Sequence, residues 1–146
     1  MANPTITTFL TAEHREIDSL FSEAESTGCD DDGLAFMTFH AALIRHLGIE
    51  EQVLYDLYEI RNGDGGPIAP MRADHERIRI LLGRAAQERS CRSDAAFRTA
   101  MKALGTATQR HYAQEEKTLY PLFDGSFAGE TGKLIEAMEA MAGVQY

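Results

Sequence analysis

The sequence is poor in the residues that mark several large classes of protein. Its 146 residues include no tryptophan, four prolines and two cysteines. The cysteines, Cys29 and Cys91, form no C-x-x-C pair, which excludes zinc-ribbon and thioredoxin-type sites. In a reducing cytoplasm we expect both to be free thiols, and a disulfide between them, acting as a redox switch, is the alternative.

Long apolar runs and basic charge are also scarce. No stretch approaches the roughly 18 consecutive apolar residues that a membrane span needs. The first residues, MANPTITTFLTAEHREID, lack the basic start and apolar core of a signal peptide, so we expect a cytoplasmic protein. Lysine and arginine number 14 against 23 acidic residues, a net charge of −9. An acidic surface repels phosphate backbones and anionic lipids, so we expect neither nucleic acid nor membrane as a partner.

The apolar residues that are present recur with helical periodicity, and the alternation typical of β-strands is absent. Four clusters of turn residues, at 28–33, 62–70, 90–94 and 124–126, separate four long amphipathic segments. Asn3 is the expected N-cap of the first helix, with Pro4 at the first helical position.

These segments predict an all-α protein, an up-down-up-down four-helix bundle over about residues 4–123. A short fifth helix is expected at about 130–142, where Leu134, Met138 and Met141 share a face. The length suits one core, so a single domain over 1–146 is predicted.

The two halves of the sequence resemble each other. TAEHREIDSLF near the start is echoed by RADHERIRILL, and HLGIEEQVLYDLYE by HYAQEEKTLYPLFD. The corresponding histidines are offset by nearly constant amounts, 61 residues from His14 to His75 and 65 from His46 to His111. A helical hairpin has therefore been used twice, with its polar residues.

Six polar residues stand out in the helical segments: His14, His46, Glu50, His75, His111 and Glu115. They include two His–Glu pairs four residues apart, which places each pair on one helix face. Residues of an antiparallel hairpin face each other when they are equally far from the turn. The midpoints between successive sets fall near residue 31, between 62 and 63, and near residue 94, each within a turn cluster. All four helices therefore bring these groups to one level of the bundle.

Burying four imidazoles and two carboxylates without partners would cost on the order of 1–3 kcal/mol or more for each group. Bound cations offset that cost, and this mixture of nitrogen and oxygen ligands suits iron, manganese or zinc. Two bridging carboxylates with two imidazoles per ion leave open positions, which oxygen binding or oxygen chemistry requires.

The pattern H14…H46-x-x-x-E50…H75…H111-x-x-x-E115 resembles the hemerythrin HHE cation-binding family. A Glu-Glu pair and an L-Y-x-L-[YF] run at each fourfold motif add to the likeness, which covers residues 4 to about 123. The resemblance implies two non-haem iron ions with an oxo or hydroxo bridge. Glu50 and Glu115 would bridge the ions and the four histidines would be terminal ligands. The family includes oxygen carriers, oxygen or redox sensors and iron-sensing domains.

Two positions depart from the oxygen-carrying members of that family. They have a second histidine four residues after the third-helix ligand, where this chain has Arg79, which cannot ligate a metal. They also place the fourth-helix carboxylate five residues after the histidine, which is Glu116 here. The internal repeat favours Glu115 because it pairs that residue with Glu50.

Other residues near the motifs receive simpler interpretations. The fifth histidine, His40, is expected to pack or support the site without ligating. Asp18 and Arg79 occupy equivalent repeat positions, and one hypothesis pairs them across the bundle near the site. The remaining neighbours are interpreted as surface acids or as packing at the bundle end: Glu51 and Glu116 in the first case, Tyr55, Tyr58 and Tyr120 in the second.

The sequence thus favours a di-iron-binding protein that binds or senses oxygen, redox or iron status. Dioxygen, another small diatomic molecule or peroxide is the expected ligand, and no protein partner is identified. A di-iron enzyme acting on oxygen, peroxide or nitric oxide is the alternative, as is an iron-handling or zinc-filled structural bundle. Ferritin-like carboxylate enzymes fit less well, because they use Glu-x-x-His whereas the order here is His-x-x-x-Glu.

Overall fold

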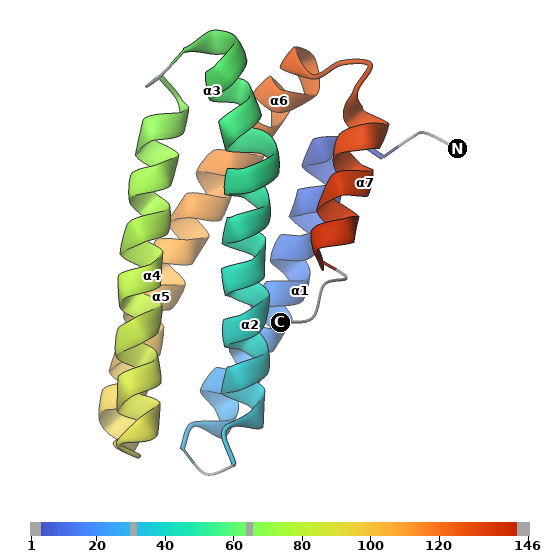
Figure 1. Ribbon diagram of the computed structural model, residues 1–146. Helices are drawn as coiled ribbons and strands as arrows, with labels where there is room; N and C mark the ends of the chain where they lie inside the picture. Colours follow the sequence, from blue (N-terminus) through green and yellow to red (C-terminus); the bar gives the residue numbers. More distant parts are fainter. Residues whose placement is uncertain (1–3, 30–31, 64–65, 143–146) are drawn as a thin grey trace.

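The computed structural model describes residues 4–29, 32–63 and 66–142, and within them the chain forms helices joined by turns, with no strand (Figure 1). The elements are α1 (Ile6–Thr27), α2 (Leu34–Ile49), η1 (Glu50–Tyr55), α3 (Asp56–Asn62), α4 (Ile68–Ser90), α5 (Asp94–Gln114), η2 (Glu115–Leu119), α6 (Tyr120–Ser126) and α7 (Thr131–Ala142). The label η marks π-helix, whose hydrogen bonds join residues five apart.

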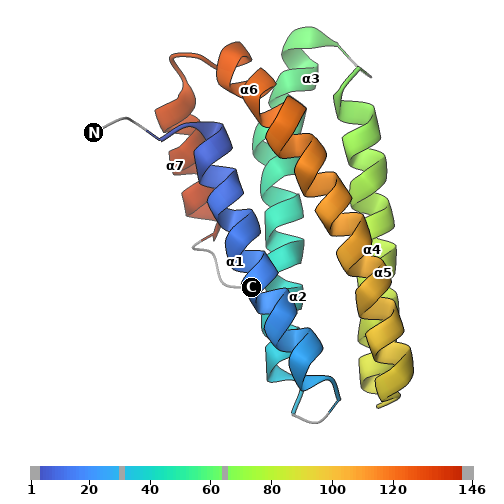
Figure 2. The same cartoon turned by 180° about the vertical axis from the view of Figure 1, so that it is seen from behind.

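Two of the four rods of the bundle are composite. The second runs without a break through α2, η1 and α3, and the fourth through α5, η2 and α6, because the residues at these junctions keep right-handed helical backbone angles. The rods run up and down in turn, α1 beside α2 and α4 beside α5 (Figures 1 and 2). This arrangement confirms the predicted all-α bundle, and α7 is the predicted fifth helix.

The first helix begins later than its sequence suggests. Thr5 is the N-cap of α1, so Pro4 precedes the helix, and Asn3 lies outside the described residues. Thr5 accepts a hydrogen bond from the backbone N–H of Thr8 at 3.0 Å, and the Thr8 hydroxyl lies 2.9 Å from the Thr5 nitrogen. This reciprocal capping box satisfies the backbone N–H groups of Thr5 and Thr8, and so fixes the start of the helix after Thr5.

The break predicted at 124–126 is also displaced. Helix α6 continues to Ser126, and the turn to α7 begins at the fully buried Phe127. Asp124 accepts hydrogen bonds from the backbone N–H groups of Ile6 at 2.8 Å and Thr7 at 3.3 Å. A residue interpreted as a turn former therefore compensates the N-terminal end of α1, where the helix dipole favours an anion.

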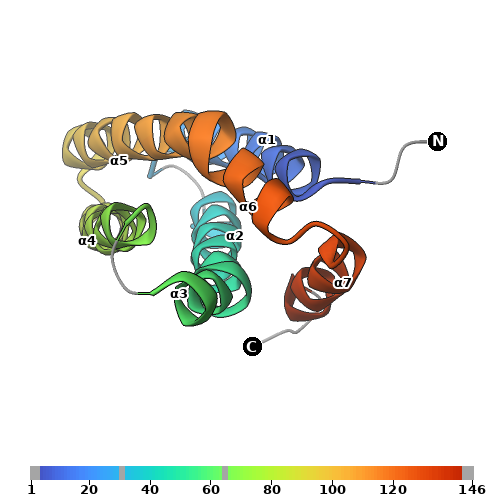
Figure 3. The ribbon, with the colours of Figure 1, turned by 90° about the horizontal axis from the view of Figure 1, so that it is seen from above.

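The apolar side chains gather in two clusters, one toward each end of the bundle. One cluster joins the start of α1 to η1, α4, α6 and α7, and Leu10, Tyr55 and Phe123 lie within it. The other fills the opposite half around Phe39 and Leu104. Viewed along the bundle, α7 lies outside the four rods and covers α1 and α2 (Figure 3). The six predicted metal ligands occupy the polar layer between these clusters.

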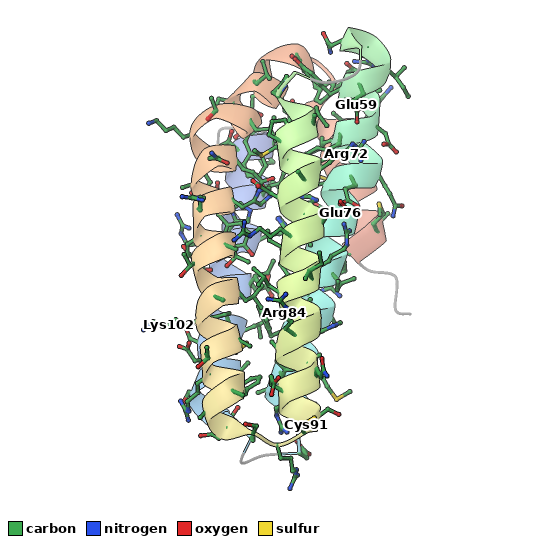
Figure 4. The ribbon with its side chains drawn as sticks, turned by 90° about the vertical axis from the view of Figure 1, so that its left-hand side faces the viewer. Glu59, Arg72, Glu76, Arg84, Cys91 and Lys102 are labelled. Carbon is green, nitrogen blue, oxygen red and sulfur yellow. The ribbon has the colours of Figure 1, made fainter. Side chains whose placement is uncertain are left out.

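Both cysteines are free thiols, Cys29 partly buried and Cys91 exposed. Cys91 lies at the end of the bundle where α4 turns into α5 (Figure 4). Among the described residues, no helix is both long and apolar enough to cross a bilayer.

Two helical glycines provide a matched test of this packing. Gly83 lies exposed in α4 with open space around a built Cβ, whereas a Cβ on Gly105 would lie 2.9 Å from Cζ of Phe21. The Gly83→Ala variant should raise the free energy of unfolding by about 0.5–1 kcal/mol through helix propensity. The Gly105→Ala variant should lower it by about 1 kcal/mol, because the Phe21 ring must shift. Urea denaturation measures both, and equal effects would contradict the close approach of α1 and α5.

Candidate metal centre

The structure brings the six predicted ligands to one place. Each of them is between 0% and 1% exposed. Their ligand atoms form two groups, and within each group the atoms all lie within 4.8 Å of one another. One group is His14, His46, Glu50 and Glu115, and the other is Glu50, His75, His111 and Glu115. Two clusters that share both carboxylates are the arrangement expected of a di-metal site with two bridging glutamates.

Each of the two shared carboxylates stands at the start of a π-helical turn. Helix α2 passes into η1 at Glu50, and α5 passes into η2 at Glu115. An α-helical spacing of four places each glutamate beside the preceding histidine, whereas a π turn also stacks residues five apart. Tyr120 therefore lies one turn beyond Glu115, and its hydroxyl lies 3.0 Å from Oε1 of that glutamate. The π turns let a histidine, a glutamate and a tyrosine of one rod point into the same layer.

The imidazole rings meet in pairs through their Nε2 atoms. This atom of His14 lies 3.2 Å from that of His46, and the corresponding atoms of His75 and His111 are 3.0 Å apart. Two nitrogens bound to the same ion at about 2.0–2.1 Å, with a right angle between the bonds, would be about 3 Å apart. Each pair of rings therefore already has the nitrogen–nitrogen distance that binding one ion requires.

The other ring nitrogen of every one of these histidines faces a carboxylate. The Nδ1 atoms of His14 and His75 lie 2.8 Å and 2.7 Å from Glu116 and Glu51. The remaining two pairs are His46 with Glu13 at 3.3 Å and His111 with Asp74 at 3.1 Å. A carboxylate at Nδ1 holds the proton there, so the free lone pair is on Nε2, which points at the site, and it makes the imidazole a stronger ligand.

These outer carboxylates correct the prediction that Glu51 and Glu116 are exposed neighbours. Their side chains are 22% and 23% exposed, and both are held against a histidine. The signal was present in the sequence, because an acid adjoins each ligand motif: Glu13 before His14, Asp74 before His75, Glu51 after Glu50 and Glu116 after Glu115. A residue next to a ligand on one helix thus supports a ligand on a neighbouring helix.

Two tyrosines contribute to the centre instead of only packing at the bundle end. Tyr55 and Tyr120 are fully buried, and each donates a hydrogen bond to the carboxylate of the opposite half. Tyr55 reaches Glu115 Oε2 at 2.9 Å, and Tyr120 reaches Glu50 Oε2 at 2.5 Å. The third predicted packing residue, Tyr58, does lie against aromatic rings, those of Phe123 and Phe127.

Tyr112 is a neighbour that the sequence did not single out. Its ring stacks on the imidazole of His14, with ring centroids 3.8 Å apart and 17° between the planes. Its hydroxyl is buried and has no hydrogen-bond partner within the described part of the chain. The internal repeat places Leu47 at the equivalent position, so this stack exists in one half only.

Burial and the crowding of like groups shift the pKa values of several residues in this layer. Burial and the neighbouring His46 lower the pKa of His14 to about 2. Burial and the adjacent Glu50 carboxylate raise the pKa of Glu115 well above its usual range. Oε1 of Glu50 lies 3.3 Å from Nε2 of both His46 and His75, yet it accepts no hydrogen bond from the described residues. Burial opposes the protonation of His46 and His75, but Glu50 and the other carboxylates beside them raise the pKa of both, so protons occupy part of the layer when metal is absent. Cations bound between the imidazoles and the carboxylates would replace those protons and satisfy the unpaired Glu50 oxygen.

The two remaining predictions concern His40 and the pairing of Asp18 with Arg79. His40 does lie apart from the site, in edge-to-face contact with Phe36. The pairing of Asp18 with Arg79 is wrong, because each has a closer partner on an adjacent rod. Arg79 donates two hydrogen bonds to Glu51 at 2.7 and 2.9 Å. Asp18 accepts one from the side-chain amide of Gln109 at 2.7 Å.

The sequence was compared with known protein families, curated proteins and solved structures. The family described as the hemerythrin HHE cation binding domain matches residues 5–123. No curated protein and no solved structure matches the chain.

The crowded carboxylate pair leads to a prediction for the metal-free protein. A folded-state pKa raised above the unfolded value of about 4.3 costs stability at every pH above that value. The Glu115→Gln variant removes this titration, so at pH 7 and without metal it should be more stable than the wild type by about 1–3 kcal/mol.

Urea denaturation in the presence of a chelator measures the difference, with Glu136→Gln on an exposed face of α7 as the control. The advantage of Glu115→Gln should shrink as the pH falls toward 4. A wild type at least as stable as this variant at pH 7 would contradict the electrostatic description.

Proposed function

Since the chain belongs to the hemerythrin HHE cation-binding domain family, we propose that it binds a pair of non-haem iron ions and through them binds or senses dioxygen, redox state or iron status. The observation that carries the proposal is the pair of His/Glu groups that share Glu50 and Glu115. His14 and His46 would hold one ion, and the other two histidines of the layer would hold the second.

The ligand types are compatible with iron as the resident metal. Two imidazoles and two carboxylates per ion form a mixed nitrogen and oxygen set of intermediate hardness, which suits iron, manganese or zinc. An iron pair in such a site supplies one-electron redox chemistry and affinity for dioxygen and related small molecules. The repeated π turns also favour a functional centre, since π-bulges in helices occur frequently at functional sites.

The surrounding residues support a small ligand. All six predicted metal ligands are at most 1% exposed, so the bundle excludes bulky substrates and favours diatomic molecules or peroxide. Tyr55 and Tyr120 place phenol oxygens against the carboxylates, and Tyr120 Oη also lies 2.9 Å from His14 Nε2. These hydroxyls can donate hydrogen bonds inside the centre.

A second candidate function is enzymatic, a di-iron centre that reduces oxygen or peroxide. The two buried phenols favour it, because a tyrosine in direct contact with metal ligands is able to supply a proton at the reacting position. Arg79 favours it too, since it takes the place of the additional imidazole of the oxygen carriers. Peroxide consumption by the iron-loaded protein that falls in Tyr55→Phe and Tyr120→Phe would support this function over simple binding.

Metal counting tests the proposal most simply. Protein produced with iron supplied should contain two iron ions per chain. His14→Ala and His75→Ala should each reduce that number, because each removes one imidazole from a different ion. His40→Ala should retain both ions, since His40 lies outside the centre and packs on Phe36.

The outcome of metal counting also separates the alternatives. A visible charge-transfer band that appears in air and vanishes under vacuum indicates reversible oxygen binding. Zinc in place of iron indicates a structural bundle. A folded wild type that takes up no metal, or a His40→Ala variant that loses as much iron as His75→Ala, would contradict the assignment.

A further inference from the structure

The internal repeat makes the two halves of the centre nearly equivalent, but some of the departures from that equivalence are charged. With an offset of 61 residues, His14 corresponds to His75. One turn further along each helix, Asp18 corresponds to Arg79, so opposite charges occupy matching positions. The half that contains His14 and His46 is called the first half below, and the half that contains His75 and His111 the second half.

In the second half, a fixed cation stands behind the histidine. Glu51 accepts a hydrogen bond from Nδ1 of His75 at 2.7 Å, and the same carboxylate is held by both terminal nitrogens of Arg79. The bidentate contact fixes the guanidinium in place, and the Arg79 side chain is only 36% exposed. A guanidinium stays protonated at every physiological pH, so this charge is permanent.

The first half has an anion in the corresponding place. Asp18 is partly buried and is held by the neutral amide of Gln109 at 2.7 Å, which does not offset its charge. Within the described part of the chain, the arginine that pairs with Glu116 behind His14 is Arg15, at 3.5 Å, and the Arg15 side chain is 65% exposed. That contact is screened by water and contributes little to the field inside the bundle.

Other charges near the two halves do not remove this difference. Glu76 is the repeat counterpart of Arg15 and is exposed on α4, as Figure 4 shows. Arg72 approaches the face of Tyr55 at 5.7 Å, but it is paired with both Asp56 and Glu59. The opposing exposed charges are screened, and Arg72 is neutralised by its two carboxylates.

Arg79 in the same way offsets the charge of Glu51, the acid behind His75. Among the described residues, Asp18 and Glu116 in the first half have no such partly buried cation. The partly buried Asp18 and Arg79 therefore dominate the contrast between the halves.

We propose that Arg79 and Asp18 give the two metal positions different reduction potentials, so that the ion held by His75 and His111 accepts an electron first. A fixed cation beside an ion disfavours its higher charge state, and a fixed anion favours it. The proposal rests on the di-iron function proposed above. It concerns the one-electron reduction of ferric to ferrous iron, with the electron supplied by an external mediator.

The expected effect is measurable. Neutralising one unit charge near the centre should change the equilibrium constant for reducing the nearer ion about tenfold, which corresponds to about 59 mV for one electron. Because the groups are only partly buried, high salt should reduce the separation between the two reduction steps without abolishing it.

Two substitutions test the proposal from opposite directions. Arg79→Gln should lower the potential of the second-half ion, and Asp18→Asn should raise that of the first-half ion. Both changes reduce the difference between the potentials of the two one-electron steps. A potentiometric titration of the iron-loaded protein, followed by its visible absorbance and by the amount of half-reduced centre, measures that difference. Lys102→Gln, on the outer side of α5 far from the centre, is the control (Figure 4).

The results distinguish this proposal from the function on which it rests. In one outcome, the wild type binds two iron ions while the difference between the two reduction potentials stays unchanged or widens in both variants. That result would overturn the charge assignment and leave the di-iron function intact. A change in Lys102→Gln as large as that in Arg79→Gln would also overturn it. A folded wild type that binds no iron would contradict both the charge assignment and the di-iron function. If one variant fails to fold, the other still decides, since each acts on a different ion.

Discussion

Everything in this bundle depends on the enclosure of four imidazoles and two carboxylates between two apolar clusters. Isolated buried polar groups of this kind are expensive, and two carboxylates side by side are more so. The protein itself satisfies the outer ring nitrogens, because Nδ1 of each of the four histidines faces a carboxylate. It leaves the inner side open: the four Nε2 atoms converge on the two carboxylates, and Glu50 Oε1 accepts no hydrogen bond from the described residues. Bound cations are the physical complement of such a layer.

Other features of the fold follow from supplying those ligands. A helical hairpin used twice would provide each of two ions with two imidazoles and let both ions share two carboxylates. The π turns that begin at Glu50 and Glu115 add a tyrosine from each composite rod to the layer without interrupting the helix. The outer acids come from residues adjacent to the ligands, so one short motif on one helix also orients a ligand on the next. The fold and the site are therefore products of the same repeated segment.

Much of this could be predicted from the sequence, for reasons that can be stated. The bundle followed from helical periodicity and turn residues. The level of the site followed from the midpoints between ligand motifs, because antiparallel helices of regular rise fix which residues face each other. The π turns could not be predicted, since they depend on tertiary packing and have no propensity signal comparable to that of an α-helix. The roles of Glu51 and Glu116 were missed because an acid beside a ligand has the composition of a surface residue, and only the packing of the next helix shows that it is enclosed. The same limit explains the incorrect pairing of Asp18 with Arg79: the repeat indicates equivalent positions but not which neighbouring rod each side chain meets.

Stability measured with and without metal tests the central claim most directly. Thermal unfolding of the iron-loaded protein should occur at a clearly higher temperature than that of the same protein after chelation, because ions that bind the folded centre relieve its unpaired buried groups. Restoring iron should restore the higher transition temperature. If chelation removes the metal and the transition temperature does not change, the buried layer is satisfied without cations, and the claim that it requires them is wrong.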